Sequence, residues 1–256
     1  MFHKATTRSL RLWRTYQTVT GLDQGKRLAA YRAVDDVLET THRIVGLGSG
    51  STIKFALERI AQKPHLHDIV FVPTSFQTKQ LILEHGLRLG SIDQYTSIAV
   101  TIDGADEVDP HLNAIKGGGA CMFQERLVAQ ASDTLVLIAG KDSAHRQLVA
   151  SSQWTRGIPV EIIPAALTTV KHILEVMFPG ISVRLRMANP SDKAGPVVTD
   201  NGNLVLDCHM GPIEDPQAIY QKIKLVTGVL EVGIFDMARV AYFGRVHTDE
   251  VDIWYK

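Results

Sequence analysis

The sequence is poor in cysteine, in net charge and in long apolar runs, and each shortage excludes a class of protein. Cys121 and Cys208 are its two cysteines and form no Cys-x-x-Cys pair, so neither a disulfide framework nor a thiolate zinc site is indicated. The 27 basic side chains equal the 27 acidic ones, which argues against a basic surface for nucleic acid or a membrane. The longest apolar run, at 135–139, is far too short to span a bilayer. We therefore expect a cytoplasmic protein with neither a nucleic-acid nor a membrane partner.

Metal-binding patterns are also missing. Ten histidines are present, yet they form no His-Glu-x-x-His motif and no three-ligand cluster. His65 and His67 follow a proline in a loop-like stretch, where we expect both to be solvated. The sequence therefore predicts no metal site and no cofactor.

The first 22 residues contain no acid and carry Lys4, Arg8, Arg11 and Arg14 among serines and threonines. This composition is typical of an organellar transit peptide. The alternatives are a disordered extension or an upstream start codon. We expect residues 1–24 to form a disordered N-terminal extension that lies outside the fold.

Apolar spacing from residue 25 to 155 alternates between helical and extended periods. Strands are expected at 44–45, 69–72, 98–102 and 135–139, and helices at 26–38, 53–60, 76–85 and 125–131. This alternation predicts an α/β fold, a Rossmann-like and mostly parallel sheet flanked by helices. Ligands of such sheets bind at the carboxyl ends of the strands.

The pattern changes after about Trp154. Strands are expected at 160–163, 182–186, 197–199 and 203–207, and helices at 170–177 and 218–226. Asp200-Asn201-Gly202-Asn203 is a strong hairpin turn between the last two strands. We predict a smaller α+β (ferredoxin-like) domain over 156–235, and a late strand at 240–244 that returns with residues 236–256 to the first sheet.

Two glycine-rich segments suit an anionic ligand. Gly46-Leu47-Gly48-Ser49-Gly50-Ser51-Thr52 opens a helix, where free N–H groups and the helix dipole favour an anion. The segment is neither a Walker loop nor a dinucleotide-binding motif, so one phosphate or carboxylate fits better than a nucleotide. Lys116-Gly117-Gly118-Gly119 lets backbone approach a ligand and adds a mobile charge. The alternatives are a capped helix after a tight turn, and a flexible loop with a solvated lysine.

Three carboxylates near these segments suggest proton transfer. Asp103 and Asp106 bracket a Gly-Ala turn, whose geometry explains one acid, and the second is expected to bind hydroxyls or move protons. Glu125 could merely favour a helix N-terminus through the dipole. In a dry pocket beside a polarised carbonyl it would instead be a base for a C–H proton. Cys121 has no histidine near it in the sequence, which favours a packing role.

Taken together and in order, these segments resemble ribose-5-phosphate isomerase of the A type, and its eukaryotic branch most of all. The likeness runs from about residue 26 to the C-terminus. The matching pieces are the segments 46–52, 73–77, 102–109, 115–119, 124–125, 157–161 and 194–203.

The resemblance implies an aldose–ketose isomerase of the non-oxidative pentose phosphate pathway, which interconverts D-ribose 5-phosphate and D-ribulose 5-phosphate without a metal. Glu125 would move the proton between C2 and C1 through an enediolate. Asp103 would assist ring opening, while Asp106 and Lys116 would handle charge and protons at O1 and O2. The implied substrate-binding residues are Lys26, Ser49, Gly50, Ser51, Thr52, Gly104, Ala105, Gly117, Gly118, Gly119 and Lys141. Because the family forms homodimers or homotetramers, we expect one of these.

One segment departs from the family pattern. The family has Ile-Ala-Asp followed shortly by a substrate-facing lysine, whereas this chain has Ile138-Ala139-Gly140-Lys141, and Lys141 is the expected counterpart. Two other functions stay open. A non-catalytic sugar-phosphate sensor would have no need for Glu125, and an acyl-CoA transferase-like enzyme would use a glutamate as its nucleophile.

Overall fold

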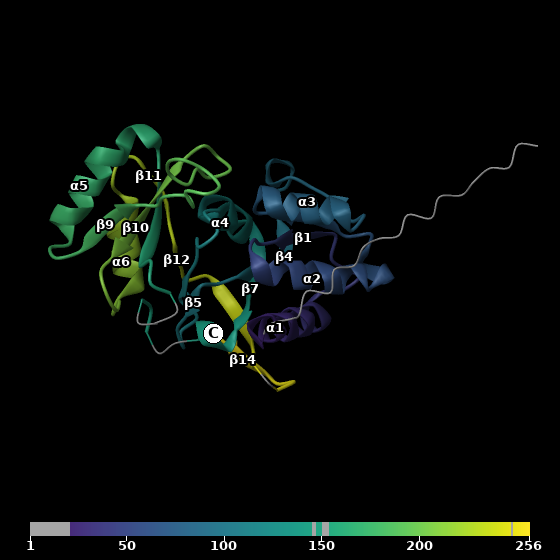
Figure 1. Ribbon diagram of the computed structural model, residues 1–256. Helices are drawn as coiled ribbons and strands as arrows, with labels where there is room; N and C mark the ends of the chain where they lie inside the picture. The colour runs from purple at the N-terminus through teal and green to yellow at the C-terminus, as the bar shows by residue number, and fades with distance from the viewer. Residues whose placement is uncertain (1–20, 145–146, 150–153, 247) are drawn as a thin grey trace, which may run out of the picture.

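The computed structural model describes residues 21–144, 147–149, 154–246 and 248–256. A large sheet with helices on both faces lies beside a smaller helix-covered sheet, and a short third sheet lies between the two (Figure 1).

Seven strands form the large sheet in the order β14-β13-β7-β4-β1-β2-β3. Their bounds are β1 Ile44–Leu47, β2 Val70–Pro73, β3 Arg88–Leu89, β4 Ile98–Gly104, β7 Ser132–Gly140, β13 Ala238–Gly244 and β14 Val251–Tyr255. All neighbours pair in parallel except β13 and β14. The late strand therefore returns to the first sheet as the sequence predicts, whereas the sequence does not predict β3 or β14.

The strand order brings the candidate loops together. From β1 the chain moves outward through β2 and β3, and then crosses to β4 on the other side of β1. The winding reverses between β1 and β4, which is where open α/β sheets bind ligands. The glycine motif follows β1, and Asp103 is the penultimate residue of β4. Both segments therefore lie at the switch point of the sheet.

Four helices cover this sheet. Helices α1 Gly21–Val37, α2 Ser51–Ala61 and α3 Phe76–Glu84 pack on one face, and α4 Met122–Gln130 packs on the other (Figure 1). Strand β7 shows the alternation that two covered faces require, because Val136 and Ile138 pack with α1 while Leu135 and Leu137 pack with α4.

The first helix starts earlier than the sequence suggests. Residues 21–24, which we assign to the N-terminal extension, form the first turn of α1, and residues 1–20 lie outside the described residues. Gly21 and Gly25 are poor helix formers and hide this turn from a propensity argument. Asp23 favours it through the helix dipole. The other domain boundaries stay predictions.

The second sheet has the predicted ferredoxin-like connectivity. Its elements are β8 Ile158–Ile162, α5 Leu167–Met177, β9 Ser182–Leu185, β10 Leu204–His209, α6 Pro216–Lys224 and β11 Val229–Val232. The strands pair antiparallel in the order β11-β8-β10-β9, which makes a βαββαβ unit and confirms the predicted fold class. The strand expected at 197–199 is wrong, because this segment makes a single isolated bridge, from Val198 to Leu204.

The third sheet joins the two larger units. It consists of β5 Glu107–Val108, β6 Ala114–Ile115 and β12 Ile234–Phe235, all antiparallel. Lys116 directly follows β6, and its N–H donates to the Gly233 carbonyl at 2.9 Å. Gly233 in turn donates its N–H to the Pro159 carbonyl of β8 at 2.7 Å. The backbone of Lys116 is therefore fixed by both larger units.

A glycine pair lets α1 approach β13. A Cβ on Gly244 would lie 1.8 Å from the Gly25 carbonyl oxygen, and a Cβ on Gly25 would lie 2.6 Å from the Gly244 carbonyl oxygen. Larger residues would force the helix away from the sheet. Because Lys26 follows Gly25, this contact also sets the position of that lysine.

We expect Gly244→Ala to lower the free energy of unfolding by about 1–3 kcal/mol, since overpacking displaces α1. Urea unfolding should show a lower midpoint with an unchanged m value. Arg245→Ala is the control, because its ion pairs are exposed and worth about 1 kcal/mol or less. Equal midpoints for Gly244→Ala and wild type would contradict the packing argument.

Candidate active site

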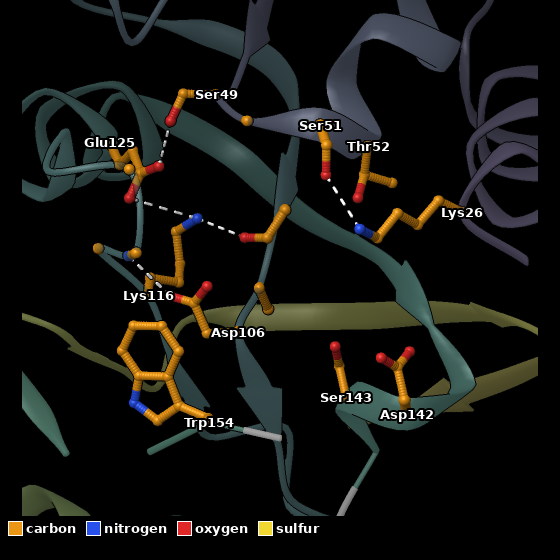
Figure 2. Close-up of a pocket in the computed structure, with 16 residues that line it drawn as sticks. Lys26, Ser49, Ser51, Thr52, Asp106, Lys116, Glu125, Asp142, Ser143 and Trp154 are labelled. Carbon is orange, nitrogen blue, oxygen red and sulfur yellow. Dashed lines mark hydrogen bonds and ion pairs between the residues drawn. The ribbon is translucent and has the colours of Figure 1, made fainter. Parts of the chain in front are cut away.

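A cavity of about 270 Å³ opens at the switch point (Figure 2). Its lining residues are Lys26, Ser49, Gly50, Ser51, Thr52, Gly104, Ala105, Asp106, Lys116, Gly117, Gly118, Gly119, Glu125, Asp142, Ser143 and Trp154. The structure thus brings together all the predicted site residues except Asp103, which lies beneath the cavity, and Lys141.

Lys116 is the centre of the cluster. Its side chain is 2% exposed, and its ammonium lies 2.9 Å from Asp103 Oδ2 and 3.4 Å from Glu125 Oε2. The same ammonium donates to the Gly104 carbonyl oxygen. A buried charge needs such partners, because burial removes its hydration. This lysine is therefore fixed, and the alternative of a flexible loop with a solvated lysine is wrong.

Asp103 links strand β4 to the loop after β1, beneath the cavity. It is fully buried, and its Oδ1 accepts the N–H groups of Ser49 at 3.2 Å and of Gly104 at 2.7 Å. A Cβ on Gly48 would lie 1.7 Å from the same oxygen. The glycine at 48 is therefore required by the aspartate that packs against it.

Glu125 points into the cavity from the first turn of α4 (Figure 2). Its Oε1 accepts the Ser49 hydroxyl at 2.6 Å. Its Oε2 lies beside the Lys116 ammonium and makes no hydrogen bond within the described residues. The carboxylate is thus oriented through one oxygen and available through the other, which suits a base better than a residue that only favours the helix dipole.

Asp106 is held against the second glycine segment. Its Oδ2 accepts the Gly118 N–H at 2.8 Å, and a Cβ on Gly118 would lie 2.5 Å from its Oδ1. Arg186, from the ferredoxin-like unit, donates to the carbonyls of Gly117 at 2.7 Å and Gly118 at 3.3 Å. The glycine loop is therefore fixed from both sides, and Arg186 is a supporting residue that no sequence motif indicates.

Burial sets the protonation of this cluster. It raises the pKa of Asp103 to about 7, with a further rise from Glu125, while Lys116 opposes both. Burial also raises the pKa of Asp106 to about 6, against the hydrogen bond from Gly118. Burial disfavours the charge on Lys116, but the carboxylates of Asp103 and Glu125 outweigh it and raise the pKa of this lysine. The site therefore combines one buried ammonium with two aspartates whose pKa values are raised toward neutrality, Asp106 at the cavity and Asp103 beneath it.

The other end of the cavity suits an anion. Helix α2 begins at Ser51, and no side chain in the described part of the chain caps its N-terminus. Lys26 reaches across from α1, and its ammonium donates to the Ser51 hydroxyl at 3.1 Å (Figure 2). Uncapped N–H groups, hydroxyls and one ammonium together make a site for a phosphate or carboxylate. The capped-helix alternative is wrong for this segment.

Lys141 does not line the cavity. Its ammonium lies 2.7 Å from Asp252 Oδ2 and 5.0 Å from the centre of the Trp254 ring, both in β14. The predicted substrate contact is corrected accordingly, since a carboxylate and an aromatic face at the sheet edge hold this lysine. Its neighbours Asp142 and Ser143 line the cavity instead.

Trp154 also lines the cavity, and no motif in the sequence singles it out. Its indole N–H donates to the Gly157 carbonyl at 2.6 Å. At the start of α4, burial raises the pKa of the Cys121 thiol to about 12, so a thiolate nucleophile is disfavoured there. This agrees with the packing role expected for that cysteine.

The arrangement defines an α/β protein with a general acid–base site and an anion site in one small cavity. Within the described residues, no helix is long and apolar enough to cross a membrane, and no cluster of three or more His, Cys, Asp or Glu side chains could hold a metal ion.

Comparison with known proteins agrees with this class. The model of the family ribose 5-phosphate isomerase A (phosphoriboisomerase A) matches residues 70–248. A ribose-5-phosphate isomerase of Eremothecium gossypii is 50% identical over 87% of this chain and 90% of its own. A solved D-ribose-5-phosphate isomerase in complex with phospho-erythronic acid is 33% identical with a TM-score of 0.83, over 92% of this chain and 99% of its own. A solved ribose 5-phosphate isomerase from Plasmodium falciparum is 32% identical with a TM-score of 0.81, over 90% of this chain and 97% of its own.

The chain therefore belongs to the ribose 5-phosphate isomerase A family, and it is an isomerase.

Asp106→Asn should remove a pH dependence of stability. The folded pKa of about 6 exceeds the ordinary 3.8, so between these values the folded protein binds more protons than the unfolded chain. Wild-type stability therefore falls as the pH rises through this window. The variant lacks this titration. The difference in free energy of unfolding, variant minus wild type, should therefore rise by at most roughly 3 kcal/mol from about pH 4 to about pH 7, because each pKa unit corresponds to about 1.4 kcal/mol. Urea unfolding across this range measures it, and a difference that does not change with pH would contradict the assignment.

Proposed function

We propose that this isomerase interconverts D-ribose 5-phosphate and D-ribulose 5-phosphate, in the non-oxidative pentose phosphate pathway, by proton transfer at Glu125. The observation that carries the proposal is a single cavity with the Glu125–Lys116 pair at one end and the uncapped start of α2 at the other. A phosphorylated ligand in a solved relative supports the same ligand class.

In the proposed reaction the phosphate binds at Ser51, Thr52 and Lys26, and the open-chain sugar extends toward Glu125. Glu125 Oε2 removes the C2 proton of the aldose, and the electron pair forms the C1=C2 double bond of an enediolate. The negative charge on O1 is stabilised by the Lys116 ammonium, which is already in place and needs no reorganisation. Glu125 then returns its proton to C1 to give the ketose.

The hydroxyl protons must also move, because the aldose has a hydroxyl on O2 and the ketose has one on O1. Asp106 lines the cavity, and its pKa of about 6 lets it both accept and donate near neutrality. We assign it the transfer from O2 to O1. Asp103 does not line the cavity, so its proposed role is to hold Lys116 and the Ser49 backbone in position. Ring opening, which the resemblance gives to Asp103, is assigned to Asp106 as well.

Lys116 supplies the positive charge that a divalent cation would otherwise bring to the enediolate, so we propose that the reaction needs no metal. The family resemblance further supports a homodimer or homotetramer in the cytoplasm. Light scattering coupled to size-exclusion chromatography would measure the assembly.

Glu125→Gln should bind ribose 5-phosphate with nearly unchanged affinity and lose its turnover. Removal of a general base costs roughly 10²–10⁴-fold in kcat, while the amide fills the same space. An assay of ribulose 5-phosphate formation, with and without a chelator, measures both claims. Glu84→Gln, the same substitution at an exposed glutamate of α3 outside the cavity, is the control and should keep kcat. Turnover near that of wild type in Glu125→Gln would exclude this base, and a loss with the chelator would contradict the metal-free reaction.

Asp142→Asn should improve binding of the sugar phosphate. Asp142 lines the cavity, and its Oδ1 has no hydrogen-bond partner within the described residues. A Cβ on Gly140 would lie 2.4 Å from this oxygen and 3.9 Å from Lys26 Cγ, so the carboxylate is near the lysine of the anion site. Loss of its charge should lower KM about fivefold with kcat unchanged, and added salt should shrink this gain. A higher KM in the variant would show instead that Asp142 accepts a hydrogen bond from the substrate.

A further inference from the structure

The turn at 199–203 in the ferredoxin-like unit is held rigidly at its base. Glu161 of β8 is fully buried, and its Oε1 accepts the Thr199 hydroxyl at 2.8 Å and the Asn203 side-chain amide at 2.9 Å. The backbone closes the turn, because Thr199 N–H donates to the Asn203 carbonyl at 2.9 Å. Gly202 supplies the positive φ of 77° that this turn requires. The tip residues Asp200 and Asn201 are therefore presented in one fixed direction.

Both tip residues reach across to the Rossmann-like unit. Asp200 Oδ2 accepts the Phe76 N–H at the start of α3 at 2.7 Å, where the helix dipole also favours a carboxylate. Asn201 Oδ1 accepts the Gln124 side-chain amide at 3.2 Å on α4. Two adjacent residues of one turn thus contact two different helices of the other unit.

The residue at each contact is the sequence neighbour of a residue that belongs to, or supports, a different end of the active site. Gln77, next to Phe76, accepts the Gly50 N–H through its Oε1 at 3.1 Å, and this hydrogen bond fixes the glycine loop before α2. Gln124 directly precedes Glu125 in α4. Asp200 is therefore linked through α3 to the phosphate side of the cavity, and Asn201 is linked through Gln124 to the proton-transfer side.

We propose that Asp200 and Asn201 form an interdomain clamp of positioning residues. Through α3 and Gln77, Asp200 sets the conformation of the phosphate loop and hence the affinity for substrate. Through Gln124, Asn201 sets the position of the Glu125 carboxylate and hence the rate of proton transfer. Neither residue lines the substrate cavity, so neither is a catalytic residue.

Packing does not replace these hydrogen bonds. Asp200 and Asn201 are exposed, and a cavity of about 380 Å³ lies beside the clamp, lined by Asp200, Phe76 and Gln124 among others. Loss of a clamp side chain therefore removes its hydrogen bond without opening the core. The folded state should survive the substitution while the relative position of α3 or α4 changes.

The test rests on the proposed isomerase function and compares steady-state kinetics of Asp200→Ala and Asn201→Ala on ribose 5-phosphate. Asp200→Ala should raise KM about fivefold with kcat near that of wild type, and Asn201→Ala should lower kcat about fivefold with KM nearly unchanged. Asn201→Asp keeps an acceptor oxygen for Gln124 and should restore kcat. Asp192→Ala, an exposed aspartate elsewhere in the same unit, is the matched control and should change neither constant.

A purely structural role would move kcat and KM together in both variants, and that result would overturn the proposal. So would effects no larger than those of Asp192→Ala. Hydrogen–deuterium exchange separates this proposal from the proposed function. Exchange should rise at 46–52 and at the start of α3 in Asp200→Ala, and in the first turn of α4 in Asn201→Ala. An inactive wild type would reject ribose 5-phosphate as the substrate, and unchanged exchange in both variants would reject the clamp.

Discussion

The buried ammonium of Lys116 is the constraint on which the rest of the site depends. It persists in the interior because Asp103 and Glu125 lie on either side of it, and those carboxylates are tolerated there because of the ammonium. When Asp103 and Glu125 are both ionised, Lys116 balances only one of the two negative charges. This excess charge and the burial together raise the pKa of Asp103 toward neutrality.

This cluster also explains the glycines around it. From the sequence, Gly48 and Gly118 suggest backbone that approaches a ligand. In the structure, the space that a Cβ would need at these positions is taken by Asp103 and Asp106 respectively. Some of the glycines are therefore required by the packing of these carboxylates and not by a ligand. Gly50 differs, because it has a φ of 93° and open space around it, which leaves room for a ligand.

The long periodic segments were predictable because their apolar spacing reflects the two covered faces of the sheet. The two-residue strands β5, β6 and β12 were not, since so short a segment carries no period and its pairing is fixed by distant residues. In the site, local motifs indicate Glu125, Lys116 and the two glycine segments. The sequence does not indicate the position of Lys141, because its partner Asp252 lies near the other end of the chain. Asp142 and Trp154 carry no local signal, and no motif indicates that hydrogen bonds from Ser49 and Gly104 hold Asp103 beneath the cavity.

The short third sheet has a consequence for how the enzyme is made. Lys116 emerges from the ribosome early, with the glycine loops and Glu125, but the carbonyl that fixes its backbone belongs to Gly233, and the ring of Phe235 lies 5.5 Å from its ammonium. A nascent chain that ends before these residues has Asp103, Lys116 and Glu125, but it lacks the carbonyl that fixes the Lys116 backbone and the aromatic ring beside the ammonium. The hydrogen bond that fixes the Lys116 backbone therefore forms late in translation, when the segment with Gly233 and β12 reaches β6.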